Sequence, residues 1–150
     1  MQYHTKQLGF YSATDRIRML CYIATDKQIN NMLDYPIIKR AMVYELFWEV
    51  NDPTPLTTLN ESRELYEALI EWCDEEFDGC VGEGWRSDMS KIIMLWGFPD
   101  YIYYEPMPYN SFGGYQIWEY NIKNYRLIFA ERYVDCYYLQ NIPIELNRWF

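Results

Sequence analysis

The chain has little positive charge. Its 150 residues include 13 lysines and arginines against 22 aspartates and glutamates, which gives a formal net charge of −9. A nucleic-acid-binding protein needs a basic patch, and an anionic membrane surface attracts basic segments. The composition therefore predicts a protein that binds neither nucleic acid nor an anionic membrane surface.

Ligands for a metal ion are also scarce. His4 is the only histidine, and the four cysteines (Cys21, Cys73, Cys80 and Cys136) form no C-x-x-C pair. We therefore expect neither a metal nor another cofactor. Four buried free thiols are the favoured state of the cysteines. The even number of cysteines also allows one or two disulfides. Cys73 could pair with Cys80 only if the intervening helix ends before Cys80.

Long apolar runs are lacking as well. No run approaches the roughly 20 residues of a membrane-spanning helix, so we expect no membrane span. Charged residues interrupt the first 25 residues, which is unlike a signal peptide. The chain is expected to be cytoplasmic, or to be exported with its signal removed.

Aromatic residues, in contrast, are abundant, with 16 Tyr, 7 Phe and 6 Trp. This richness excludes a disordered chain and exceeds what one core needs, so some rings should be half-exposed, as at interfaces. A length of 150 residues predicts a single domain spanning residues 1–150.

Apolar spacing predicts helices in the first half of the chain. One begins at Thr14, and another begins at Thr25 with Gln28 completing a capping box. A third runs from Pro36 to near Asp52, and a fourth covers about 59–78 behind a capping box of Thr58 and Glu61. In the first helix the residues expected to face inward are Ile17, Leu20, Cys21 and Ala24. In the third helix they are Ile37, Ala41, Tyr44 and Trp48, and Ile38, Met42 and Leu46 widen this face. In the fourth helix they are Leu65, Ala68, Leu69, Trp72 and Cys73.

The second half of the chain is predicted to form strands at 91–96, 101–104, 115–121, 125–131 and 134–140, with a loop at 105–114. Short connections between these strands favour an antiparallel meander. The predicted class is α+β, with an N-terminal helical half packed on a C-terminal antiparallel β-sheet.

Several widely spaced segments together resemble the GWxTD domain of bacterial proteins. They are Phe47–Trp48, Asn51–Pro55, Asn60–Glu61, Gly84–Asp88, Ile92–Leu95, Gly97–Pro99 and Ile117–Tyr120. The chain departs from the family pattern at Ser87, Asn51, Met89–Ser90 and Phe98, where the family has Thr, Arg, Arg-Gly and Pro. The family has no established activity, and its members are typically exported. The resemblance therefore implies an interaction or scaffold module of the bacterial cell envelope, located in the periplasm or at the cell surface.

The residues that carry this resemblance are predicted to form a structural hub, in which Asp52–Pro55 meets Gly84–Asp88. The hub residues are Trp48, Asp52, Thr54, Asn60, Glu61, Gly84, Trp85, Ser87, Asp88, Gly97, Pro99, Trp118 and Tyr120. A rival hypothesis makes Asp52, Glu61 and Asp88 the carboxylates of a hydrolase. Turn and capping roles for these carboxylates favour structure over catalysis, so we assign no catalytic residue.

Tyrosines crowd the second predicted strand and the loop that follows it. Tyr104, Tyr109, Phe112 and Tyr115 are the candidate partner-binding residues, because exposed aromatic loops are typical of protein interfaces. The same rings could stack on sugars, so a carbohydrate- or peptidoglycan-binding domain is the alternative function.

Overall fold

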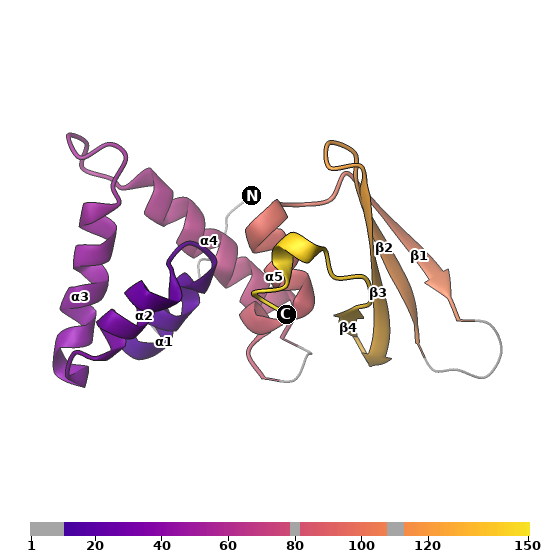
Figure 1. Cartoon of the computed structure of the whole chain (residues 1–150), viewed down its shortest axis with the longest axis horizontal. Helices are drawn as coiled ribbons and strands as arrows, with labels where there is room; N and C mark the ends of the chain where they lie inside the picture. Colours follow the sequence, from indigo (N-terminus) through magenta and orange to yellow (C-terminus); the bar gives the residue numbers. More distant parts are fainter. Residues whose placement is uncertain (1–10, 79–81, 108–112) are drawn as a thin grey trace. The chain divides into compact units, whose positions relative to one another are not determined.

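The computed structural model describes residues 11–78, 82–107 and 113–150. Contacts divide the chain into two compact units, Met1–Trp72 and Cys73–Phe150, and the boundary falls within one helix, α4 (Glu61–Glu76). Each unit is described by itself below. Helices dominate the first unit and the β-sheet lies in the second, which confirms the predicted α+β class (Figure 1).

The first unit contains α1 (Ala13–Met19), a 3₁₀ turn at Leu20–Tyr22, α2 (Asp26–Leu33), α3 (Ile37–Val50) and the start of α4. Both α1 and α2 pack against α3 (Figure 1). The capping box predicted at Thr25 is confirmed. The Gln28 backbone N–H donates to Thr25 Oγ1 over 3.2 Å, and the Gln28 side chain accepts from the Thr25 backbone N–H over 2.8 Å.

The core of the first unit combines aliphatic and aromatic side chains. Its buried residues are Ile17, Leu20, Ala24, Met32, Tyr44 and Trp48. The Trp48 ring packs edge-on against Phe47 and at a tilt against Tyr66, with centroid distances of 5.4 Å and 5.7 Å. The Tyr66 hydroxyl donates to the Met19 carbonyl, which fixes α4 to the end of α1.

The predicted inward face of α3 is largely wrong. Tyr44 and Trp48 are buried, but Ile37, Ile38, Met42 and Leu46 are exposed, and Ala41 is exposed as well. Apolar residues surround this helix on every side, so spacing alone does not identify the face that packs. Pro36 precedes the first helical residue rather than occupying it.

The fourth helix also differs from its prediction. Asn60, rather than Thr58, caps α4, because Asn60 Oδ1 accepts the backbone N–H of Arg63 over 3.0 Å. Leu65, Ala68 and Trp72 are exposed, whereas Ile70 and Cys73 are buried.

The second unit contains an antiparallel sheet in the order β1-β2-β3-β4, which confirms the predicted meander. The strands are β1 (Tyr101–Pro106), β2 (Gly114–Tyr120), β3 (Tyr125–Tyr133) and β4 (Cys136–Leu139). Strand β1 therefore continues to Pro106, two residues beyond its predicted end. One face of the sheet carries the buried side chains of Trp118, Tyr120, Leu127, Phe129 and Leu139.

The strand predicted at 91–96 is wrong, since these residues belong to helix α5 (Asp88–Trp96). Ser87 caps α5 by accepting the backbone N–H of Ser90 over 3.1 Å, and Gly97 ends it with φ of +80°. Met89, Ile92 and Ile93 are buried on one side of the helix. A short apolar run fits a buried helix as well as a strand, and the cap at Ser87 is the signal that separates the two.

The cysteines do not all share one state. Cys21 and Cys73 are thiols, whereas Cys136 is disulfide-bonded, so the prediction of four thiols is wrong. No helix in the described part of the chain is long and apolar enough to cross a membrane.

Candidate functional site

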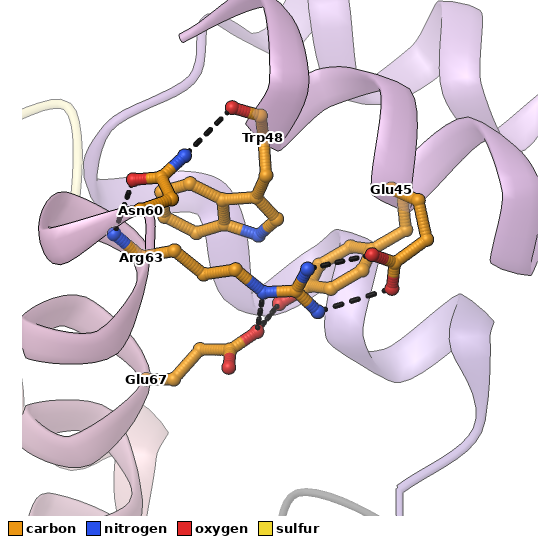
Figure 2. Close-up of polar contacts among 6 residues, drawn as sticks. Glu45, Trp48, Asn60, Arg63 and Glu67 are labelled. Carbon is orange, nitrogen blue, oxygen red and sulfur yellow. Dashed lines mark hydrogen bonds and ion pairs between the residues drawn. The ribbon is translucent and has the colours of Figure 1, made fainter. Parts of the chain in front are cut away.

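A network of charged side chains joins α3 to α4 within the first unit. Figure 2 shows Arg63 between two carboxylates: its two terminal nitrogens donate to Glu45 over 2.6 Å and 3.0 Å, and its Nε donates to Glu67 over 2.9 Å. The Arg63 guanidinium lowers the pKa of the Glu45 carboxyl below its ordinary value. The bidentate pair of Arg63 and Glu45 holds the two helices together, and the single cation of Arg63 is shared by two carboxylates, so the network keeps an excess of negative charge.

The inner side of this network is closed by Tyr44 and Trp48. The Tyr44 hydroxyl donates to Glu67 over 2.8 Å, and burial raises the pKa of Tyr44 well above its usual range. Asn60 donates to the Trp48 carbonyl over 2.8 Å, so it closes the end of α3 while capping α4 (Figure 2). Trp48 and Asn60, two of the predicted hub residues, are therefore in contact and have a structural role.

A depression of about 460 Å³ opens beside the network. Its lining includes Glu45, Glu49, Asp52, Glu64 and Glu67, against the single cation of Arg63. An acidic hollow repels anions and favours cationic groups. No group of three or more His, Cys, Asp or Glu in residues 11–78, 82–107 and 113–150 is arranged to hold a metal ion.

The loop between α3 and α4 brings together two of the carboxylates of the hydrolase hypothesis. Asp52 Oδ1 accepts the backbone N–H of Thr54 over 2.8 Å, and the Thr54 hydroxyl donates to Glu61. The hydrogen bond from Thr54 lowers the pKa of Glu61 below its ordinary value. A general acid needs a raised pKa, so Glu61 is suited to a structural role rather than to proton donation.

The second unit contains a compact polar junction at Gly84–Ser90. The Ser90 hydroxyl donates to the Gly84 carbonyl over 2.7 Å, and the Trp85 backbone N–H donates to Asp74 Oδ1 over 3.0 Å. A Cβ on Gly84 would stand 2.2 Å from the Asp74 carbonyl oxygen, so only glycine fits at this position. Trp85 is buried beside it.

Asp88, the third carboxylate of the hydrolase hypothesis, is bound to β4. Its Oδ2 accepts the backbone N–H of Leu139 over 2.9 Å, and its Oδ1 binds Lys91 Nζ over 3.0 Å. Asp88 therefore covers a backbone donor on the outer edge of the sheet. Asp88 lies in a different unit from Asp52 and Glu61, so the predicted meeting of Asp52–Pro55 with Gly84–Asp88 stays a prediction.

The remaining predicted hub residues lie at the end of α5 and in the sheet. The Tyr120 hydroxyl donates to the Gly97 carbonyl over 2.8 Å, which joins β2 to the end of α5. Trp118 packs on Phe129 with a centroid distance of 4.7 Å, and Pro99 is half-buried in the turn before β1. The hydrogen bond of Tyr120 and the ring contact of Trp118 join elements of the second unit, so both residues have structural roles.

The opposite edge of the sheet differs from the β4 edge. All six residues of β1 are exposed, and none of the described residues hydrogen-bonds to its outer backbone edge. Tyr101 and Tyr103 lie on one face, while Ile102 and Tyr104 lie on the other, and Tyr104 is 70% exposed. The predicted binding residue Tyr104 is therefore accessible. Tyr115, opposite Glu105 in the ladder, is half-buried.

The face of the sheet that carries Tyr101 and Tyr103 is accessible and mixes apolar with charged side chains, since Glu119 stands opposite Tyr101 and pairs with Arg126 over 3.4 Å. Tyr103 stands opposite Ile117, and Ile117 stands opposite Ile128, which is exposed. The rings of Tyr101 and Tyr103 have a centroid distance of 6.4 Å and an interplanar angle of 31°. The predicted binding residues Tyr109 and Phe112 lie outside the described residues.

Comparison with known proteins identifies no relative, because no protein-family model, curated protein or solved structure matches the chain. The resemblance to the GWxTD domain therefore stays a prediction.

Sequence reasoning missed the Arg63 network and the β1 edge. The i, i+4 spacing of Arg63 and Glu67 was the one local signal for the network, whereas Glu45 joins it from another helix and has no local signal.

Proposed function

We propose that the chain is a non-enzymatic protein-interaction module, in which an extended segment of a protein partner adds to β1. The observation that supports this proposal is the exposed outer edge of β1. Unpaired strand edges template the pairing of another chain, and natural proteins usually cover or charge them. Asp88 covers a donor on the β4 edge. Within the described part of the chain nothing covers the edge at Tyr101–Tyr104, and the charge and the proline of β1, Glu105 and Pro106, stand only at its end.

The exposure of both faces of β1 favours a polypeptide as the ligand. An added strand would place alternate side chains against Tyr101 and Tyr103 on one face and against Ile102 and Tyr104 on the other. It would also satisfy the unpaired backbone groups of β1. A sugar that stacks on one face would leave the other face and the backbone edge in water.

Charge restricts the class of partner segment. The chain carries a net charge of −9, and Glu105 stands near the end of β1. Complementary charge steers association and disfavours acidic partners. We therefore infer a segment in which apolar residues alternate with neutral or basic ones.

A location in the bacterial cell envelope is part of the proposal. Disulfides persist in the periplasm and at cell surfaces and are rare in the cytosol. The disulfide at Cys136 supports an oxidising compartment, in agreement with the exported proteins that the sequence resembles.

Selection from a random-peptide display library tests the proposal. We expect the parent chain to select peptides with alternating apolar residues. Tyr101→Ser/Tyr103→Ser should lose most of that binding, because it removes the exposed rings of one face. Tyr133→Ser is the matched control, since this tyrosine is exposed in β3 away from β1. Enrichment of no peptide, or equal binding by the β1 variant, would refute the proposal.

A carbohydrate-binding function is the second candidate, and the tilted pair of Tyr101 and Tyr103 rings favours it. Adjacent sugar rings stack on such aromatic pairs. Cosedimentation with insoluble peptidoglycan distinguishes the two candidates. Sedimentation that Tyr101→Ser/Tyr103→Ser abolishes, together with no peptide selection, would replace the protein partner by a glycan.

A further inference from the structure

One face of strand β1 is uncharged. Ile102 and Tyr104 lie on this face, and both side chains are exposed. Their partners in the ladder with β2 are Trp118 and Gln116, and neither carries a charge. A strand added to β1 would therefore meet only apolar and neutral polar side chains on this face.

The opposite face of β1 is rich in tyrosine and ends in a carboxylate. Tyr101, Tyr103 and Glu105 lie on this face and are all exposed. Among the residues that the structure describes, Glu105 has no ion-pair partner, whereas Glu119, which lies on the same face in β2, pairs with Arg126 over 3.4 Å. Glu105 is therefore the carboxylate on this face that a partner segment can pair with.

A strand added to β1 brings its side chains beside those of β1 on each face. Directly opposite residues of paired strands have Cβ atoms about 4.5–5.5 Å apart, and opposite charges at such positions stabilise the pairing, whereas like charges destabilise it. The face of a tyrosine ring also attracts the cationic group of lysine or arginine. The face of β1 that carries Tyr101, Tyr103 and Glu105 is thus suited to basic side chains.

We infer that the partner segment has a basic face and an apolar face, with lysine or arginine beside Glu105 and apolar residues beside Ile102 and Tyr104. This inference rests on the proposed function, because it specifies the segment that adds to β1. Further basic residues, two and four positions along the segment, stand beside Tyr103 and Tyr101. The alternation is the same for either direction of the segment, since successive side chains of a strand point to opposite faces in both.

Pro106 limits the length of the segment that can pair. Proline has no backbone N–H, so Pro106 cannot donate a hydrogen bond to an added strand. Pairing along the edge of β1 therefore extends over Tyr101–Glu105, which corresponds to about five residues of the partner segment.

The sequences of the peptides selected by display provide the first test. Peptides whose binding depends on Tyr101 and Tyr103 should carry lysine or arginine at alternate positions, with apolar residues between them. Ile102→Ser/Tyr104→Ser should weaken the preference for apolar residues and keep the preference for basic ones. Peptides that depend on β1 but lack this alternation would overturn the inference and leave the proposed function standing. Selection of no peptide would overturn both.

Charge reversal at Glu105 provides the second test. Each basic residue of one selected peptide is replaced by glutamate in turn, and binding is measured by titration calorimetry at low salt. At one position the replacement should weaken binding to the parent chain about fivefold or more, because it exchanges an attraction for a repulsion. The same replacement should strengthen binding to Glu105→Lys.

Glu145→Lys is the matched control, since it makes the same change of charge at an exposed position outside β1. It should keep the parent's preference for the basic peptide. Circular dichroism checks that each variant remains folded. If Glu105→Lys kept the parent's preference, or if Glu145→Lys reversed it equally, the pairing of a basic residue with Glu105 would be wrong.

Discussion

Replacement of Asp88 tests whether this carboxylate stabilises the second unit or serves catalysis. Its Oδ2 accepts the Leu139 N–H over 2.9 Å, and its Oδ1 pairs with Lys91 over 3.0 Å. Asp88→Asn keeps one acceptor oxygen but removes the charge. The hydrogen bond to Leu139 then loses its charge assistance, and the half-buried ion pair is lost. Together these changes should lower the free energy of unfolding by about 1–2 kcal/mol.

Asp88→Ala should cost more than Asp88→Asn. It leaves the Leu139 N–H without its acceptor and removes an anion from the first turn of α5, where the helix dipole favours negative charge. We expect a loss of about 2–4 kcal/mol. The order of stability should therefore be parent, then Asn, then Ala.

Urea denaturation followed by far-ultraviolet circular dichroism measures these differences. The midpoint should fall while the slope stays constant. Asp78→Asn, which removes an exposed carboxylate, is the control and should unfold like the parent. If Asp88→Asn and Asp88→Ala both unfold like the parent, the structural assignment of Asp88 is wrong and the hydrolase hypothesis regains support.

Three further predictions follow from buried groups. Trp85→Ala should lower the free energy of unfolding by about 3–5 kcal/mol, measured in the same urea experiment, because Trp85 is buried beside the closely packed Gly84; an unchanged midpoint would contradict this packing. Burial raises the pKa of the Cys73 thiol to about 12, so iodoacetamide at pH 8 should label Cys73 only after denaturation. Burial also raises the pKa of Tyr44 and Tyr120, so the neutral hydroxyls contribute their full stability below pH 10, and this stability is lost as the pH rises above 10. The urea midpoint of the parent chain should therefore fall between pH 9 and pH 11, and the fall should be smaller in Tyr120→Phe.

Local signals in the sequence account for most of the elements. The capping box at Thr25, the stop after α3 and the alternation in β2 and β3 each depend on residues within one turn or one strand, so they could be predicted. The run at 91–96 could not be assigned from its apolar residues, because both a buried helix and a buried strand have this pattern. The cap at Ser87 resolves that ambiguity.

Contacts between elements account for what the sequence did not predict. Arg63 reaches Glu45 across 18 positions of sequence, and Asp88 reaches Leu139 across 51. Neither pair has a spacing that separates it from other charged residues. The sequence could not predict the disulfide at Cys136 either, because four cysteines allow several pairings and their number does not choose among them.

Exposed apolar side chains on α3 and β1 are the surfaces of this chain most suited to binding a partner. Sequence spacing assigned Ile38, Met42 and Leu46 to a core, yet they are exposed. Apolar side chains of β1 are likewise exposed on both of its faces. Exposed apolar patches of this kind are typical of interaction sites. The residues of α3 belong to the first unit and β1 belongs to the second. The proposed function places peptide binding at β1, so Tyr101→Ser/Tyr103→Ser should lose binding to the selected peptides, whereas Met42→Ser/Leu46→Ser should retain it. Equal loss of peptide binding in the two variants would contradict the assignment of binding to β1 alone.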